Sequence, residues 1–294
     1  MGYSSVLRPD IFNNQTMIVT GGGSGIGRCT AHELAALGAH VVILGRKPEK
    51  LITVAEEISE DGGSVSYYSC DIRDEEKVKE VVATIVQKHG QIHGLVNNAG
   101  GQYPSPLAMI NKKGWDTVIS TNLTGGFLMA REVFTQCMNT KGGSIVNIVA
   151  DMWGGMPGMG HSGAARAGMV NFTQTAAVEW GPFGVRINAV APGWIMSSGL
   201  DTYDDYTKQK IKGLKNHVPL QRLATEAEVS SVISFLLCDG SAFINGDTIK
   251  IDGGAPLGSP IFPMQKTKPS KMYNGFHRYS IPDVLKDDFE DQDS

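Results

Sequence analysis

Short apolar runs rich in β-branched residues alternate with longer helical patterns along most of this chain. Seven runs occur in order, namely TMIVT, HVVIL, SVSYYS, IHGLVNN, SIVNIV, VRINAV and DTIKIDGG. Strands separated by helices need right-handed crossover connections, which make the strands parallel and place helices on both faces of one sheet. The sequence therefore predicts an α/β protein built on a doubly wound, parallel, seven-stranded sheet.

The regular alternation stops after Gly254. The next stretch, PLGSPIFPMQKTKPSKMYNGFHRYS, is rich in proline and in mixed charge, and the acidic DDFEDQDS closes the chain. This composition is typical of an extension rather than of a second core. Because 294 residues suit one α/β domain, we expect a single domain over residues 1–254 and a C-terminal extension over residues 255–294. The extension would lie over the body or over a neighbouring subunit.

Charge and cysteine spacing exclude several classes of protein. The formal net charge is -4, the signs are mixed and no basic block occurs, so we expect a small-molecule substrate and no nucleic-acid partner. The N-terminus has no signal pattern, and no apolar run reaches the roughly 20 residues of a membrane span. Without CxxC or metal-ligand spacing, the thiols are expected to be reduced and to hold no metal; they are Cys29, Cys70, Cys137 and Cys238.

The first apolar run, TMIVT, leads into GGGSGIG and then into a helical pattern. Glycine lets the backbone turn tightly, and it lets a pyrophosphate approach the helix N-terminus, where free N–H groups and the helix dipole attract negative charge. Between a first strand and a first helix, this motif predicts a dinucleotide site. The residues expected to hold the cofactor are Gly21, Gly23, Ser24, Gly25, Ile26 and Gly27.

The end of the second apolar run, VVILGRKPEK, predicts which ribose the site accepts. Recognition of a free ribose 2'-hydroxyl usually needs an acidic residue here, but the chain has Gly45, Arg46 and Lys47. Glycine leaves room, and the planar guanidinium of Arg46 suits a phosphate. We therefore expect NADP(H) rather than NAD(H). The alternative is that both basic residues belong to a solvated helix start.

Several further motifs follow the glycine-rich loop in a fixed order: Asp71 in CDIRD, NNAG at 97–100, Asn122 in STNLTGG, NIV at 147–149 and APGWI at 191–195. With TGGGSGIG at 20–27, they make residues 12–254 resemble the short-chain dehydrogenase/reductase family. The resemblance implies a Rossmann-type fold. It also implies contacts to the adenine, the cleft wall and the nicotinamide amide from, respectively, Asp71 and Ile72; Asn98, Ala99 and Gly100; and Pro192, Gly193 and Ile195.

The chain departs from this family at the residues that transfer protons. Members usually have a serine at or beside position 149, a tyrosine at 162 and a lysine at 166, whereas this chain has Val149, Ser162 and Arg166. Asn122 alone keeps its identity among the four catalytic positions. Arginine stays protonated at any working pH, so Arg166 can hold ribose hydroxyls and supply positive charge but cannot shuttle a proton.

HSGAARAG, together with NNAGGQYPSP, KGW and TNLTG, resembles the peroxisomal trans-2-enoyl-CoA reductase branch of this family. The 2,4-dienoyl-CoA reductases and a bacterial set assigned to citronellol are similar as well. The chain ends in EDQDS rather than in a peroxisomal tripeptide. A cytoplasmic protein is therefore expected, and the resemblance implies a homotetramer in which helices such as MVNFTQTAAVEW meet a symmetry mate.

Loss of the tyrosine is tolerated better by some reactions than by others. Alcohol oxidation needs a base for the hydroxyl proton. Reduction of a C=C bond conjugated to a thioester first needs hydrogen-bond donors at the thioester oxygen, which Asn122 and Ser162 could supply beside the charge of Arg166. Asp151 precedes Arg166 by fifteen residues, the separation at which similar dienoyl-CoA reductases place a proton-donating tyrosine before their lysine. It is either that acid or a solvated or capping residue.

Other positions also have two interpretations. His161 is either catalytic or packed, and Tyr103 either contacts the substrate or packs its loop. The segment from Trp194 to Arg222 should form a substrate-side lid. Its basic residues would meet the phosphates of an acyl-CoA thioester or belong to a solvated helix face; they are Lys208, Lys210, Lys212 and Lys215.

Three functions follow from these observations. The first is an NADPH-dependent oxidoreductase that reduces the C=C bond of an enoyl-CoA-like thioester. The second is a dehydrogenase of branched acyclic alcohols or aldehydes of the citronellol type. The third is a catalytically silent NADP-binding scaffold or sensor, which the missing proton-transfer residues keep open.

Overall fold

A computed structural model of the protein describes residues 2–257, 264–265 and 268–290. Seven parallel strands form the central sheet in the order β3-β2-β1-β4-β5-β6-β9. This confirms the predicted α/β fold with a doubly wound, Rossmann-type sheet. The strands are β1 Thr16–Thr20, β2 His40–Gly45, β3 Ser64–Ser69, β4 Gly94–Asn97, β5 Gly143–Ile148, β6 Val185–Pro192 and β9 Thr248–Ile251.

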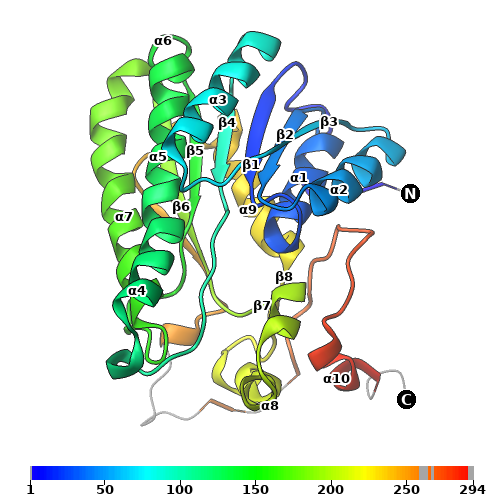
Figure 1. Cartoon of the computed structure of the whole chain (residues 1–294). Coiled ribbons are helices and arrows are strands. Elements are labelled where there is room, and N and C mark those ends of the chain that lie inside the picture. Colours follow the sequence, from blue (N-terminus) through cyan, green and yellow to red (C-terminus); the bar gives the residue numbers. More distant parts are fainter. Residues whose placement is uncertain (1, 258–263, 266–267, 291–294) are drawn as a thin grey trace.

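Helices cover both faces of the sheet (Figure 1). The helices are α1 Gly25–Ala36, α2 Pro48–Glu60, α3 Glu75–His89, α4 Lys112–Ile119, α5 Gly125–Val133, α6 Asn139–Lys141, α7 Gly160–Trp180, α8 Asp205–Gly213, α9 Glu226–Leu237 and α10 Asp287–Glu290. One apolar core joins the sheet to α1, α2 and α9, and a second joins it to α3, α5 and α7. Because the central strands are buried on both faces, their sequences are nearly continuous apolar runs rather than alternating ones.

The strand order places the functional edge of the sheet. Neighbouring β1 and β4 are separated in the chain by β2 and β3, so the connections leave in opposite directions from this pair. In such sheets, ligands bind outside the carboxyl ends of the strands at this reversal. The short pair β7 (Ile195–Met196) and β8 (Ala224–Thr225) and helix α8 lie beyond that edge (Figure 1).

The described part of the predicted extension packs on the body of its own chain. Phe276 is only 2% exposed and lies against Cys29 of α1 and Ala227 of α9. The Arg28 guanidinium lies 5.0 Å from the centre of its ring. The extension then turns toward the lid, where Val284 joins an apolar cluster with residues of α8 and of the segment before it. Residues 258–263, 266–267 and 291–294 lie outside the described residues.

Helix lengths, clusters of metal-ligating side chains and the four cysteines are visible in the described part of the chain. No helix there has the length and apolar character that a membrane crossing requires. Among the same residues, no group of His, Cys, Asp or Glu side chains is placed to hold a metal ion. Cys29, Cys70 and Cys137 are buried free thiols, and Cys238 is free and half-buried.

Replacing Phe276 by alanine should destabilise the fold, because it removes a buried ring from the contact between the extension, α1 and α9. We expect the free energy of unfolding to fall by about 3 to 5 kcal/mol. Urea unfolding followed by circular dichroism measures it. Met272→Ala, in the same segment but 37% exposed, should change stability by less than about 0.5 kcal/mol. Equal effects of the two substitutions would show that the ring is not an anchor.

Candidate active site

The glycine-rich loop has the geometry of a diphosphate cradle. Gly21 and Gly25 have φ angles of 66° and 58°, a left-handed region that glycine adopts without strain. Ser24 precedes α1 in an extended conformation, and its side chain makes no capping hydrogen bond. The first N–H groups of α1 are therefore left to a bound anion, which the helix dipole also favours.

The loop is held tightly against the end of β4. The Asn98 amide nitrogen donates to the carbonyl oxygens of Thr20 and Gly21, at 2.9 and 3.3 Å. The Thr20 hydroxyl accepts hydrogen bonds from the backbone N–H groups of Asn98 and Ala99, both at 3.0 Å. A Cβ added at Gly27 would overlap with the Asn98 amide and with the Gly21 carbonyl. Glycine is therefore required there by a close approach of side chain and backbone.

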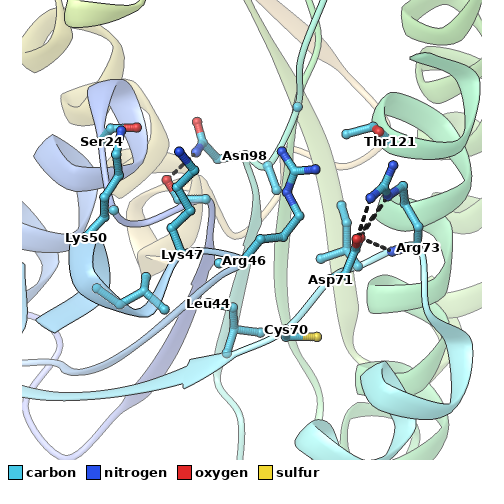
Figure 2. A pocket seen from close by; sticks show the side chains of 17 residues that line it. Ser24, Leu44, Arg46, Lys47, Lys50, Cys70, Asp71, Arg73, Asn98 and Thr121 are labelled. Carbon is cyan, nitrogen blue, oxygen red and sulfur yellow. Dashed lines mark hydrogen bonds and ion pairs between the residues drawn. The ribbon is translucent and has the colours of Figure 1, made fainter. Parts of the chain in front are cut away.

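A cavity of about 300 Å³ opens between this loop and the ends of β2, β3 and β4 (Figure 2). Ten of the predicted cofactor residues line it, namely Gly21, Gly23, Ser24, Arg46, Lys47, Asp71, Ile72, Asn98, Ala99 and Gly100. Gly25, Ile26 and Gly27 lie in the first turn of α1 next to it. Arg46 and Lys47 are exposed after the end of β2, where the sequence predicts recognition of the ribose.

The lining of this cavity includes three polar or charged side chains that were not predicted from the sequence, namely Lys50, Arg73 and Thr121. The Arg73 guanidinium binds both carboxylate oxygens of Asp71 (Figure 2), with contacts of 2.9 and 3.2 Å from Nε. This pairing holds the pKa of Asp71 below its ordinary value, and Arg46 adds to the effect. Asp71 is therefore an ionised acceptor fixed in place by its neighbour. The basic residue two positions after Asp71 in CDIRD is the sequence feature from which this pairing could have been predicted.

A second cavity of about 270 Å³ adjoins the loop and is lined by Ser24, Gly25, Arg28 and Glu226, among others. The Glu226 side chain was not predicted from the sequence. It is 6% exposed at the start of α9, and burial raises its pKa to about 7 although the charge of Arg28 opposes this. Glu226 therefore takes up a proton near neutral pH, which reduces its repulsion of an anion at the loop.

Asn122 lies on a π-helical turn, Ser120–Thr124, between α4 and α5. Its amide nitrogen donates to the Gly101 carbonyl oxygen at 2.8 Å, and its amide oxygen accepts from the Gly101 N–H at 2.9 Å. The side chain is 3% exposed. Both hydrogen-bonding groups of the predicted catalytic amide therefore hold the segment that follows β4.

Arg166 is half-buried on α7, and its Nη1 donates to the Ile148 carbonyl oxygen at 2.5 Å. Its Nε has no hydrogen-bond partner, and no carboxylate within the described residues forms an ion pair with it. Its Nη2 lies close to Gly100, 2.7 Å from where a Cβ would be. Burial lowers its pKa to about 10, so Arg166 remains a cation at neutral pH.

Ser162 and His161 face the loop after β4. The Ser162 hydroxyl, which is fully buried, donates to Gln102 Oε1 at 2.7 Å. His161 Nδ1 accepts the Ser162 N–H at 2.9 Å, and its ring packs edge-on against Tyr103 at 4.7 Å between centres. These contacts favour the packing interpretation of both His161 and Tyr103. The structure thus brings Asn122, Ser162 and Arg166 together around one segment.

Asp151 lies on another side of the site, after β5. Its N–H donates to the Pro192 carbonyl oxygen at 3.3 Å. Burial and then the charge of Asp252 raise the pKa of its carboxyl, and Lys250 opposes the rise. Asp151 is therefore associated with the ends of β6 and β9, where Pro192 is located, and its charged neighbours do not include Arg166 among the described residues.

The predicted nicotinamide segment crosses the same edge of the sheet. The Gly193 N–H donates to the Ile251 carbonyl oxygen at 2.9 Å, and a Cβ at Gly193 would lie 2.8 Å from the Asp252 Cα. Ile195 is buried in β7. On the lid, Lys210 lies 4.3 Å over the Tyr206 ring and Lys212 pairs with Asp287 at 2.7 Å. These contacts favour the interpretation that the two lysines belong to a solvated helix face.

Comparison with known proteins agrees with this architecture. Residues 21–256 match a family model described as Enoyl-(Acyl carrier protein) reductase. The chain belongs to the short-chain dehydrogenase/reductase family, whose fold binds a nicotinamide cofactor.

The individual relatives are named for different reactions. A structure of a citronellol catabolism dehydrogenase of Pseudomonas aeruginosa PAO1 is 64% identical, with a TM-score of 0.78, over 86% of this chain and 99% of that one. A Bacillus subtilis protein assigned as a 2,4-dienoyl-CoA reductase is 36% identical over 82% of this chain and 96% of its own. A Beutenbergia cavernae structure, assigned as an NAD(P) dependent gluconate 5-dehydrogenase and holding NADP at low occupancy, is 30% identical, with a TM-score of 0.77, over 85% and 100%.

Gly27→Ala should weaken binding of the cofactor, because the new methyl group would separate the loop from Asn98. A packing strain of about 1 to 3 kcal/mol corresponds to ~5- to 150-fold in affinity. Quenching of intrinsic fluorescence by NADPH measures the dissociation constant. Gly213→Ala, whose Cβ meets nothing within 4 Å, is the matched control and should bind normally. Normal binding by both variants would contradict the cradle assignment.

Proposed function

We propose that the protein is an NADPH-dependent reductase of the C=C bond of an enoyl-CoA-like thioester. The observation that carries this proposal is the Arg166 cation, whose Nε is buried without a hydrogen-bond partner and which has no carboxylate partner in the described structure. Its Nη2 lies beside Gly100. A buried, unpaired charge is costly unless it stabilises an opposite charge during the reaction. Enoyl reduction develops that negative charge on the thioester oxygen and needs no tyrosine base.

Three cations support the preference for NADP(H). Arg46 and Lys47 are exposed at the ribose end of the cavity, and Arg73 lies beside them on Asp71 (Figure 2). A guanidinium forms charge-assisted, bidentate bonds to a phosphate, whereas a free ribose hydroxyl offers no such partner. The cradle of Gly21 and Ser24 would hold the diphosphate. The relative that holds NADP is consistent with this choice.

The residues of this chain divide the work of the reaction. When bound, the cofactor supplies a hydride for the β-carbon of the substrate. Arg166 stabilises the negative charge that develops nearby, because its guanidinium is fixed by the Ile148 carbonyl. Asn122 holds Gly101 and so fixes the cleft wall. Asp151, whose pKa is raised by burial, is the proposed proton donor to the α-carbon.

The second candidate function is oxidation of branched acyclic alcohols, because a citronellol catabolism dehydrogenase shares 64% of its residues with this chain. That reaction requires a base within reach of the hydroxyl proton. Arg166 cannot act as one, and Ser162 already donates its hydrogen bond to Gln102. The geometry around these two residues therefore supports enoyl reduction better.

An NADPH-oxidation screen distinguishes the functions. The substrates are enoyl-CoA esters of several chain lengths, citronellal and geranial, and NADPH binding is measured in parallel. Turnover of thioesters supports the proposal. Turnover of the aldehydes without turnover of any thioester supports the alcohol dehydrogenase function. Tight NADPH binding without turnover of either class would identify the protein as a scaffold or sensor.

A homotetramer in the cytoplasm is the proposed working form. Apolar side chains remain exposed on α5 and around the end of α7, namely Phe127 at 37%, Val178 at 77% and Phe183 at 51%. Such a surface suits a second copy of the chain, since identical surfaces meet in closed symmetry. Sizing with light scattering at micromolar concentration tests this, and a monomer would contradict it.

Arg46→Asp combined with Lys47→Ala should weaken NADPH binding much more than NADH binding. The lost contacts are charge-assisted bonds to the 2'-phosphate, and at roughly 1.5 to 3 kcal/mol each they correspond to at least ~10-fold in affinity. Isothermal titration with both cofactors measures the ratio. Lys113→Ala, at an exposed position of α4, is the control. Equal losses for both cofactors would refute the assignment.

Arg166→Ala should reduce enoyl reduction severely, by about 2 to 4 kcal/mol in transition-state stabilisation. The double change Ser162→Tyr with Arg166→Lys should not increase the rate, because a phenol adds a proton to an oxygen that needs only stabilisation. Steady-state kcat/KM with an enoyl-CoA measures both. Arg8→Ala, at an exposed position, is the control. Strong activity created by the double change in an inactive native protein would instead indicate a silent relative.

Asp151→Asn should lower kcat and flatten its pH profile while leaving NADPH affinity intact. Burial raises the pKa of Asp151, so the acid form persists to higher pH than in an ordinary aspartate and kcat falls as pH rises through that pKa. The asparagine variant loses this descending limb. An unchanged rate and profile would leave water as the proton source.

A further inference from the structure

Two residues that the sequence predicts to act on the substrate form hydrogen bonds to other residues of the chain instead. The Asn122 amide brackets Gly101 at 2.8 and 2.9 Å, and the Ser162 hydroxyl donates to Gln102 Oε1 at 2.7 Å. Both side chains are almost completely buried, with 3% and 0% exposed. Their hydrogen bonds are therefore used to hold two consecutive residues of the segment after β4.

The next residue is held as well. The Tyr103 ring packs edge-on against the buried His161 ring, and its hydroxyl lies against Gly114 of α4. Gly101, Gln102 and Tyr103 are thus anchored in turn. A short loop with three anchors keeps its middle side chain in one orientation, as a catalytic group requires.

The Gln102 amide has a free end. Its oxygen accepts the Ser162 proton, whereas its nitrogen forms no hydrogen bond with the described part of the chain, and the residue is exposed. The amide nitrogen therefore offers two N–H donors. Ser162 and Arg166 are four residues apart on α7 and so share a face of that helix. The Gln102 amide and the Arg166 cation accordingly belong to one side of the site.

We propose that Gln102 is a catalytic residue whose amide nitrogen donates a hydrogen bond to the thioester carbonyl oxygen of the substrate, and that Ser162 is its positioning residue. The inference rests on the proposed function. Hydride adds to the β-carbon, and the π electrons of the C=C bond move onto the carbonyl oxygen. The resulting enolate then takes one proton at the α-carbon from Asp151 or water. Gln102 keeps both of its protons throughout.

The structure explains why an amide serves here. Family members have a tyrosine at position 162, and the serine of this chain is much shorter. The space in front of its hydroxyl is taken by the Gln102 side chain. A neutral amide donor strengthens its bond as charge develops on the oxygen, and it does not titrate. Its loss should therefore lower the rate equally at every pH.

Gln102→Met and Gln102→Glu remove the donor at nearly constant size. We expect kcat for an enoyl-CoA to fall by ~100-fold in both at neutral pH, as for loss of an oxyanion donor, with NADPH affinity unchanged. The shape of the pH profile should stay unchanged in Gln102→Met, whereas the ionisable carboxyl of Gln102→Glu should make the rate fall further as pH rises. Ser162→Ala loses only the positioning bond and should cost about 5- to 10-fold. Gln87→Met, exposed on α3, is the matched control. Retention of kcat by the Gln102 variants would overturn the proposal, as would a larger loss in Ser162→Ala.

A spectroscopic readout does not depend on turnover. Hexanoyl-CoA labelled with carbon-13 at its carbonyl is bound with NADP⁺, and the C=O stretch is recorded by infrared difference spectroscopy. A hydrogen bond lowers this frequency, so Gln102→Met should return it toward the value in water-free solvent. An identical frequency in the native protein and Gln102→Met would overturn the proposal. If the native protein shows the shift yet reduces no thioester, only the proposed function fails; if it binds no thioester, both fail.

Discussion

The junction between β1 and β4 is the constraint on which the site depends. The two strands pair over only three positions, Met17 to Val19 with Gly94 to Val96. Beyond that pairing, the Thr20 hydroxyl and the Asn98 amide tie the two strand ends together. These bonds press the glycine loop against the start of the next segment, and the cofactor cavity opens where they end. A single polar cluster thus sets the positions of both the cradle and the cleft wall.

The segment from Asn98 to Tyr103 continues this arrangement into the reaction site. Its first residue supports the glycine loop, and Gly100 borders the Arg166 guanidinium. The following residues are held by Asn122, Ser162 and His161. In this chain the positions of the usual proton-transfer residues have therefore become supports for a neighbouring loop. The charge of Arg166 is left without a carboxylate in the described structure, which fits a reaction in which the substrate itself becomes negative.

The C-terminal extension connects the α2 side of the body to the segment 194–222 beyond the edge of the sheet. Arg278 binds Asp61 after α2, and the N–H groups of Asp283 and Val284 are capped by the Asp201 carboxylate of the lid. Just before Arg278, Phe276 fills a site between α1 and α9. Movement of residues 194–222 away from the body would break these contacts, so the C-terminal extension restrains that segment.

The order of strands and helices, the glycine-rich loop before α1 and the basic residues after β2 could all be read from the sequence. These features depend on local rules, because strand periodicity and glycine φ preference act within a few residues of the chain. Only the tertiary structure decided how the remaining groups are used. The burial of Glu226 and the bond from Ser162 to Gln102 depend on packing between distant parts of the chain. The sequence named Ser162 as a donor, but its acceptor lies 60 residues away in the chain, and no local pattern specifies a contact at that separation.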